Sequence, residues 1–231
     1  MELIGEALVA AIRLILTGDL ELRRIAGLSL AVSGLATLLA ALVGVPLGAA
    51  LALGRLPGRR LAILLVNTGM GLPPVVVGLT LTILLWRSGP LGSLGLLFTP
   101  PAMVAAQFIV AVPIVAGLTR AALELLDAEI VAALRVDGAA EPRVAWEIVL
   151  AARASVLVAV AAGVGRAVAE VGASLMVGGN ILGQTRILTT AIALETGKGE
   201  FALALALGMI LLALAFLVNL ALGWGQRTPR G

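Results

Sequence analysis

Residues 123–153 read LELLDAEIVAALRVDGAAEPRVAWEIVLAAR and differ in kind from the sequence on either side. The stretch mixes acidic, basic and apolar residues, and Gly138 separates two halves with helical apolar spacing. The flanking segments are apolar enough to lie in lipid. We therefore expect a membrane protein with an amphipathic helical hairpin outside the bilayer, where a soluble partner docks.

Composition supports a membrane protein and excludes several kinds of chemistry. Of 231 residues, 61% are hydrophobic and 13% are charged, about half the charged fraction of a soluble domain. Cys and His are absent, which removes thiol chemistry, disulfides and imidazole sites. We expect no metal, no cofactor and no enzymatic activity of the chain's own. The net charge of +3 is too small to indicate a nucleic-acid partner.

Apolar segments predict five transmembrane helices. They lie at about 27–54, 61–87, 101–122, 154–176 and 201–224. Residues 3–16 have apolar residues at helical spacing, which favours an interfacial helix; if they span instead, the number becomes six. The prediction is an all-α protein with an interfacial helix and lead-in over 1–26, a transmembrane domain over 27–225, and a basic tail over 226–231.

The distribution of basic residues predicts the orientation. Arginines are more numerous in the loops around 55–60 and 123–153 and in the tail than in the opposite set. The positive-inside rule therefore places the 123–153 stretch in the cytoplasm, and the N-terminus and 178–200 outside. Arg23 and Arg24 count against this orientation.

Two prolines interrupt the second predicted span. Pro73 and Pro74 lie in NTGMGLPPVVVGL, where they remove backbone donors and clash with the preceding turn. Broken helix at membrane depth is tolerated where protein or a water-filled cavity satisfies the freed carbonyls. We interpret this segment as facing a translocation path or a subunit interface, and a simple packing kink is the alternative.

An ionisable pair lies in the fourth predicted span. Arg166 and Glu170 are four residues apart and share a helix face. Charges inside a span are costly, so each indicates a functional site. The pair either locks helices together as an intramembrane ion pair, or Arg166 contributes to an anion path; we favour the lock. Gate candidates nearby are Ser174, Met176 and Asn180, together with the two prolines.

The 123–153 hairpin presents a candidate docking surface. Gly138 permits a sharp turn between its two helices. Apolar residues of the second half form one face able to sit in a groove of a partner. The predicted docking residues are Gly138, Ala139, Arg143, Val144 and Ile148. The alternative is an ordinary solvated hairpin.

The stretch 132–151 resembles the cytoplasmic loop of ABC importer permeases, which carry a Glu-Ala-Ala triplet, a glycine and an Ile-x-Leu-Pro ending. Gly138, Ile148 and Leu150 match that spacing, whereas Ala132 stands where the family has Glu and Ala151 where it has Pro. The runs NTGMGLPPVVVGL, GRAVAEVGASLMVGGN and GQTRILTTAIALETGKGEFALALALG are similar to the oxyanion branch. Within it they resemble tungstate permeases most, and molybdate permeases next.

This resemblance implies a type I importer-like bundle in a prokaryotic cell membrane. It implies a homodimer, cytoplasmic ABC ATPase subunits docked at the hairpin, an extracytoplasmic oxyanion-binding protein, and alternating access. The chain has no G-x-x-x-x-G-K-[ST] phosphate loop, so a partner must hydrolyse ATP. Alternatives are a molybdate or sulfate permease, or a secondary transporter without an ATPase, which has no need of a docking hairpin.

Overall fold

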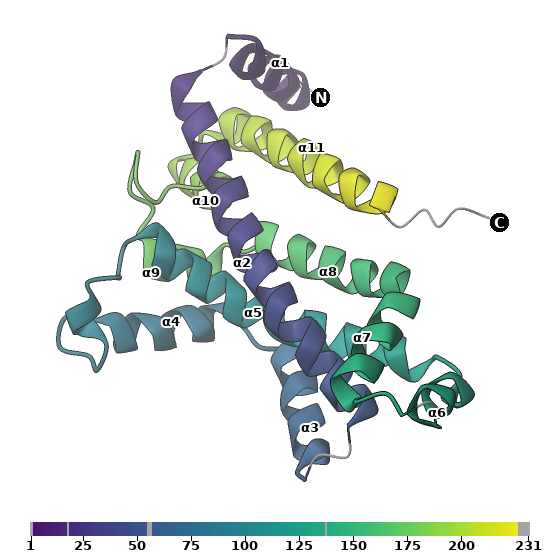
Figure 1. The fold of residues 1–231 in the computed structure, drawn as a ribbon. Helices are drawn as coiled ribbons and strands as arrows, with labels where there is room; N and C mark the ends of the chain where they lie inside the picture. The colour runs from purple at the N-terminus through teal and green to yellow at the C-terminus, as the bar shows by residue number, and fades with distance from the viewer. Residues whose placement is uncertain (1, 18, 55–56, 137, 226–231) are drawn as a thin grey trace.

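The computed structural model describes residues 2–17, 19–54, 57–136 and 138–225. This part of the chain is helical and contains no strand (Figure 1), which confirms the all-α prediction. The predicted tail, 226–231, lies outside the described residues. In chain order the helices are α1 (Glu2–Thr17), α2 (Leu20–Leu53), α3 (Arg59–Met70), α4 (Pro74–Leu85), η1 (Gly92–Leu94), α5 (Pro100–Glu124), α6 (Ala128–Val136), α7 (Glu141–Ala151), α8 (Arg153–Val168), α9 (Gly172–Gly178), α10 (Leu188–Lys198) and α11 (Phe201–Gly225).

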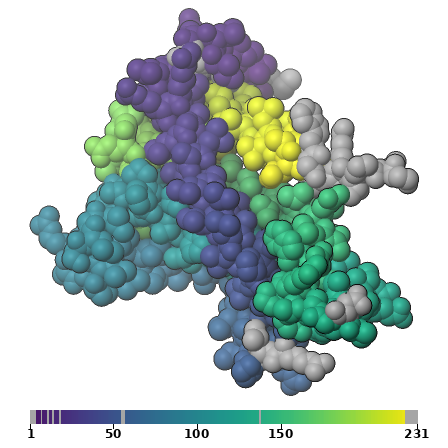
Figure 2. Space-filling model, viewed as in Figure 1, coloured from purple at the N-terminus to yellow at the C-terminus, as the bar shows by residue number. Residues whose placement is uncertain are grey.

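The longest helix, α2, organises the molecule. Its 34 residues correspond to about 51 Å at the α-helical rise. Asp19 begins it by accepting a 2.8 Å hydrogen bond from the Leu22 backbone N–H. The helix crosses the whole molecule in Figure 1, and one side of it forms a long band of the surface in Figure 2. The predicted domain boundary at 26/27 falls inside α2, because Arg23 and Arg24 continue the helix ahead of its apolar run.

Close packing of small residues joins α2 to α5. The buried residues of these two helices are mostly Ala, Gly, Ser, Thr and Val. A Cβ placed on Gly48 would lie 2.6 Å from the carbonyl oxygen of Ala116, so the backbones are in direct contact there. Small residues allow this approach between membrane helices, where packing rather than water exclusion drives association.

Within the described residues, three helices are long and apolar enough to cross a membrane by length and composition: α2, α5 and Phe201–Gly223 within α11. Two bent pairs reach the same standard together, α3 with α4 at 102° and α7 with α8 at 81°. The total is five if each pair is one span. The span predicted at 61–87 is α3 and α4, divided at the prolines as the sequence indicated, whereas the span predicted at 154–176 has a break that was not predicted, between the end of α8 and the start of α9.

The two ends of α2 carry different structures (Figure 1). At its N-terminal end, Leu22 and Ile25 share a core with α10 and α11. At its C-terminal end, Ala49 shares a core with Val144 and Ile148 of α7. The α6–α7 hairpin and the loop before α10 are therefore separated by most of a helix that exceeds the roughly 30 Å hydrocarbon core. A membrane crossed by α2, which is long and apolar enough to span it, would separate them.

Candidate functional site

The first break in a helix lies between α3 and α4. α3 ends at Met70, and Gly71 and Leu72 donate to the carbonyls of Thr68 and Gly69 at 3.1 Å each. Pro73 is extended at the N-cap of α4 and Pro74 occupies its first position, where the missing N–H costs nothing. The two prolines therefore end one helix and begin the next, and the axis turns by 102°.

The second break lies between α8 and α9, over residues 169–171. The Thr189 hydroxyl donates to the Glu170 carbonyl at 2.9 Å, and the Ser33 hydroxyl donates to the Ala167 carbonyl at 3.4 Å. The Ala167 carbonyl also accepts from the Glu170 N–H at 3.2 Å, so the Thr189 side chain of α10 satisfies the carbonyl of Glu170 while Ser33 of α2 adds a second hydrogen bond at Ala167.

Glu170 is the ionisable centre of this second break. Its carboxylate is 1% exposed, and its Oε1 accepts a 2.8 Å hydrogen bond from the Ala173 N–H, which caps α9. Its Oε2 lies 3.4 Å from Nη1 of Arg166, which is 28% exposed. A buried carboxylate is stable only when paired and hydrogen-bonded. Glu170 therefore holds the end of α8 and the start of α9 together.

The two breaks are in contact with each other. A Cβ on Gly172 would lie 2.8 Å from Cγ2 of Val75, which places the start of α9 against the start of α4. One turn further on, a Cβ on Gly78 would lie 2.7 Å from Cα of Ala173. Only glycine fits at this second position. The two half-helices α4 and α9 therefore form one closely packed pair beside α5.

The gate candidates from the sequence distribute along this pair. Pro73 and Pro74 lie at its start, and Met176 lies beside Gly78. Asn180 follows α9 in a left-handed conformation, φ 52°, and its buried Oδ1 has no hydrogen-bond partner. Ser174 is fully buried against α5, so its hydroxyl faces the interior of this subunit instead of an outer surface.

Sequence reasoning missed Gln107, the partner of Ser174. Its Nε2 donates to the Ser174 hydroxyl at 3.0 Å, while its Oε1 has no partner although the side chain is fully buried. The signal was present in the sequence, because Gln107 is the one polar side chain between Thr99 and Thr119 of an otherwise apolar segment. A polar group in such a segment needs a partner or a function.

At the other end of α2, the α6–α7 hairpin turns at Gly138. This residue has φ 77°, and the Ala139 N–H returns to the Leu134 carbonyl at 3.3 Å, which closes the end of α6. Arg135 Nε lies 2.9 Å from Oε1 of Glu141 and ties the two helices together. The hydrogen bond that Arg135 donates to that carboxylate raises the pKa of Arg135, so the cation persists at every physiological pH.

The hairpin exposes a different face from the one predicted. Val144 and Ile148 are fully buried in a core with α2, α5 and α8, so their predicted place on the contact face is corrected: they anchor the hairpin to the bundle. Arg143 remains exposed, 3.9 Å from Glu147. Trp146 and Leu150, one turn apart on α7, are 61% and 43% exposed and are not covered by the described part of the chain.

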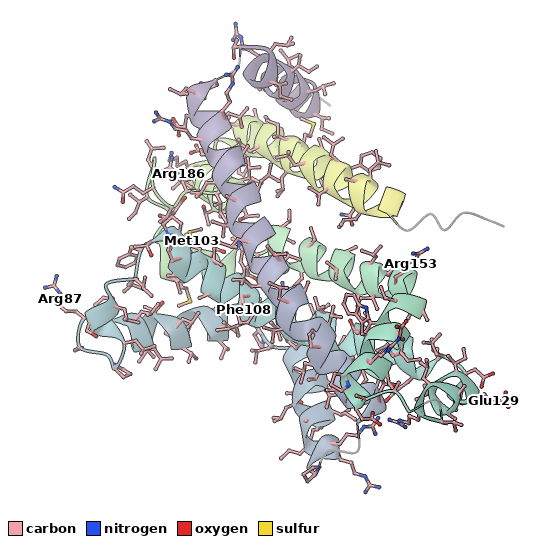
Figure 3. The ribbon with its side chains drawn as sticks, viewed as in Figure 1. Arg87, Met103, Phe108, Glu129, Arg153 and Arg186 are labelled. Atoms are coloured by element: carbon pink, nitrogen blue, oxygen red, sulfur yellow. The ribbon has the colours of Figure 1, made fainter. Side chains whose placement is uncertain are left out.

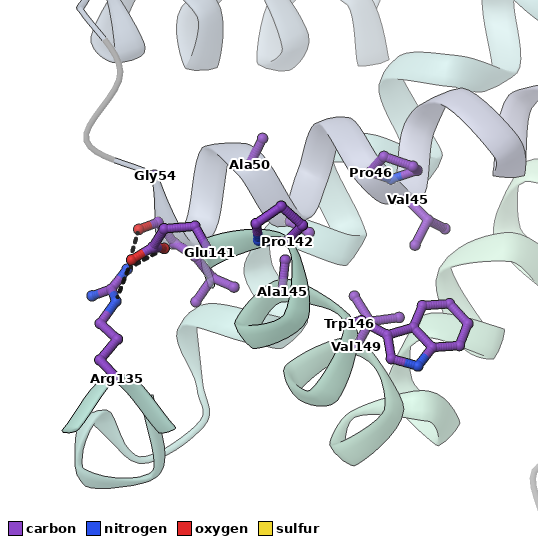
Figure 4. A pocket seen from close by; sticks show the side chains of 12 residues that line it. Val45, Pro46, Ala50, Gly54, Arg135, Glu141, Pro142, Ala145, Trp146 and Val149 are labelled. Carbon is purple, nitrogen blue, oxygen red and sulfur yellow. Dashed lines mark hydrogen bonds and ion pairs between the residues drawn. The ribbon is translucent and has the colours of Figure 1, made fainter. Parts of the chain in front are cut away.

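A cavity of about 820 Å³ lies between α7 and the last turns of α2 (Figure 4). Its wall on α7 includes Ala145, Trp146 and Val149, and its wall on α2 includes Val45 and Pro46. The lining is mostly apolar, and the Arg135–Glu141 pair lies at one end. α7 is therefore anchored along one edge and open along the other, which leaves it room to tilt against α2.

Several polar side chains of α10 and of the loop before it are hydrogen-bonded or paired within the subunit. Thr185 donates to the Gly178 carbonyl and accepts from the Ile181 N–H at 2.9 Å. Thr189 is engaged at the second break, and Lys198 Nζ lies 2.9 Å from Oε1 of Glu195. The hydroxyls of Thr185 and Thr189 are therefore used inside the subunit, whereas Gln184 and Arg186 of the loop line a groove beside α2.

The chain has bent apolar helices whose two breaks pack against each other, and an amphipathic hairpin anchored at one end of the bundle. These features are those of a polytopic membrane transport subunit. The match to known proteins makes this specific: residues 44–230 match the family described as "binding-protein-dependent transport system inner membrane component". The chain belongs to this family. It is a multi-pass protein of the cell membrane, and membership implies partner subunits, an ATPase and a binding protein.

Three relatives are similar over nearly their whole length. A "probable anion ABC transporter permease protein" of Haloferax volcanii is 41% identical over 92% of this chain and 95% of its own. A "tungstate uptake system permease protein" of Peptoclostridium acidaminophilum is 38% identical over 95% and 96%. A "molybdenum transport system permease protein" of Escherichia coli strain K12 is 30% identical over 88% and 93%.

Proposed function

We propose that this chain is the permease subunit of an ATP-driven importer for a tetrahedral oxyanion, and that the oxyanion is tungstate. The observation that carries the substrate is the 38% identity to a tungstate uptake permease across 96% of that protein. The relative named for anion transport, at 41% identity, agrees with the broader class.

The ATPase docks on the exposed face of the α6–α7 hairpin, on the cytoplasmic side. Support comes from the way the hairpin is built. Val144 and Ile148 fix α7 to α2, α5 and α8, while Trp146, Leu150 and Ile130 remain exposed. A large aromatic side chain surrounded by smaller contacts is the usual centre of an interface. Displacement of α7 by the ATPase is passed directly to α8, which ends at the Arg166–Glu170 pair.

Transport then depends on the paired breaks. Each chain supplies one α4–α9 pair, and a homodimer, as expected for a symmetric membrane transporter, brings two pairs together around a path. Movement of α8 shifts Glu170, and with it α9 and its neighbour α4. The prolines and Met176 lie on elements that move in this step, whereas Ser174 and Gln107 hold α9 against α5.

The docking surface is tested by Trp146→Asp, with Trp86→Asp as a matched control, since Trp86 is 52% exposed but lies at the end of α4. Each variant is purified in mild detergent with the cognate ATPase, and the bound ATPase is quantified. We expect Trp146→Asp to lose at least tenfold in affinity, since a central aromatic contributes 2 kcal/mol or more, roughly. Equal retention by both variants contradicts docking at this face.

Molybdate is the second candidate substrate, supported by the 30% identity to a molybdenum permease. Tungstate and molybdate are distinguished by the binding protein that delivers the anion. Calorimetric titration of the cognate binding protein with sodium tungstate, sodium molybdate and sodium sulfate gives the order directly. Tighter binding of molybdate or sulfate than of tungstate overturns the tungstate assignment and leaves the oxyanion class intact.

A further inference from the structure

A groove of about 720 Å³ lies beside the N-terminal turns of α2, at the end of this helix opposite the hairpin. Its charged lining comprises Arg23, Arg24 and Arg186 with one carboxylate, Glu21. Arg186 reaches across from the loop before α10, and its Nη1 lies 3.6 Å from Oε1 of Glu21 (Figure 3). The buried Nε of Arg186 has no hydrogen-bond partner. Three guanidinium groups against one carboxylate leave an excess of positive charge.

Apart from Gln184 and two glycines, the rest of the lining is apolar and follows α2 away from its N-terminus. It includes Leu20, Ile25, Leu28, Ala31 and Leu182. Residues 25–54 of α2 contain no charged side chain, so Arg23 and Arg24 lie directly at the start of the apolar run. One groove thus places cations at the level of the membrane surface and an apolar wall below them.

Gly27 leaves the apolar part of the groove open. A Cβ at this position would meet no atom within 4 Å. The space beside this turn of α2 is therefore empty within the chain, and a side chain could enter it without a clash. A groove that is cationic at one end and open and apolar below has the shape and polarity of a phospholipid.

We propose that this groove is a binding site for an anionic phospholipid, with the headgroup phosphodiester on Arg23, Arg24 and Arg186 and an acyl chain along Gly27, Leu28 and Ala31. Arginine donates to phosphate in a bidentate manner and holds its charge at any pH. Basic pockets between membrane helices select anionic headgroups in this way. The proposal goes beyond substrate transport and does not depend on which oxyanion is carried.

The site also bears on the predicted orientation of α2. Arg23 and Arg24 are among the basic residues that the positive-inside rule would not place on the predicted outer side. A bound phosphodiester neutralises them at the membrane surface. The lipid then fixes the end of α2 to the loop that leads from α9 to α10, and so to Glu170 through Thr189.

The test uses the purified complex of this chain with its ATPase, titrated with dioctanoyl phosphatidylglycerol and followed by native mass spectrometry. Three variants are compared with the wild type: Arg23→Gln with Arg24→Gln, which removes charge; Gly27→Leu, which fills the groove; and Arg87→Gln, an exposed arginine remote from the groove, as the control (Figure 3). Size-exclusion profiles establish that each variant is folded.

The charge variant should bind about thirtyfold more weakly, from roughly 1 kcal/mol for each arginine near a headgroup. Gly27→Leu should weaken binding by about tenfold with the charges intact, since it removes the acyl contact of a few methylene groups. Arg87→Gln should bind as the wild type does, and dioctanoyl phosphatidylcholine should bind much more weakly than phosphatidylglycerol.

Several outcomes overturn the proposal. Equal affinity for the two lipids, or unchanged affinity in both groove variants, shows that the groove does not select an anionic lipid. Displacement of phosphatidylglycerol by millimolar sodium tungstate or phosphate assigns the groove to a free anion. If the charge variant loses affinity only for the binding protein, in lipid-free detergent, the arginines form a protein contact. A failure of tungstate uptake with lipid binding intact removes the proposed function and leaves this site standing.

Discussion

Removal of Arg166 should destabilise the protein more than removal of Arg166 and the charge of Glu170 together. Arg166→Ala leaves a carboxylate that is 1% exposed with one remaining hydrogen bond, from Ala173. Breaking a buried pair costs about 3–5 kcal/mol, and the 28% exposure of Arg166 favours the lower value, about 3 kcal/mol.

Substitution of Glu170 alone should lower the free energy of unfolding by less than substitution of Arg166 alone. In Glu170→Gln the amide oxygen still accepts from Ala173, and Arg166 still reaches solvent, so the loss is about 1 kcal/mol. The double variant contains no unpaired buried charge and should lose about 1–2 kcal/mol, well below the additive value of about 4 kcal/mol. The coupling energy is therefore about 2 kcal/mol or more.

The measurement is equilibrium unfolding in mixed micelles, followed by far-ultraviolet circular dichroism. A control cycle at Arg143 and Glu147, an exposed i,i+4 pair 3.9 Å apart, should give a coupling of at most about 0.5 kcal/mol. If the Arg166–Glu170 cycle is additive within about 0.5 kcal/mol, the buried ion pair does not hold the break together and the reasoning fails.

Two further substitutions test the close contacts of the fold. Gly78→Leu should lower the free energy of unfolding by about 1–3 kcal/mol and abolish transport, because its Cβ would lie 2.7 Å from the backbone of α9; Gly34→Leu, in open space, is the control, and equal stability of the two variants refutes the contact. Gly138→Ala should lower the free energy of unfolding by about 1–2 kcal/mol, because φ is 77° at this position, and should weaken retention of the ATPase. Gly138→Asn tolerates this conformation and should retain the ATPase better than the alanine variant. The reverse order would show that a left-handed turn at Gly138 is not needed for docking.

The sequence predicted the elements better than their contacts. Charge patterning identified the hairpin at Gly138, and hydropathy identified the long helices α2, α5 and α11, because these signals are local. Pro73 and Pro74 predicted the first break, because the effect of proline on a helix is also local. The second break has no proline. It is held by a hydrogen bond between Thr189 and Glu170, which are nineteen residues apart in the sequence. Such a contact leaves no periodic pattern of apolar residues from which the break could be predicted.

The sequence also could not show which side of α7 is buried within the chain. Val144 and Ile148 have the spacing of an apolar face, and such a face packs equally well against a partner or against the chain itself. In the structure this face packs against α2 and α5 of the same chain, which are distant from α7 in the sequence. Exposed Trp146 could be assigned to the outer face only once the inner face was known.

The most direct test of the account is uptake of tungstate into proteoliposomes that contain this chain, its ATPase and its binding protein. The account predicts that tungstate accumulates only when ATP is supplied on the side of the membrane where the ATPase is bound. Omission of the ATPase should stop accumulation. Molybdate should compete with tungstate more strongly than chloride does. Accumulation without the ATPase, driven by an ion gradient alone, would show a secondary transporter and contradict the central claim.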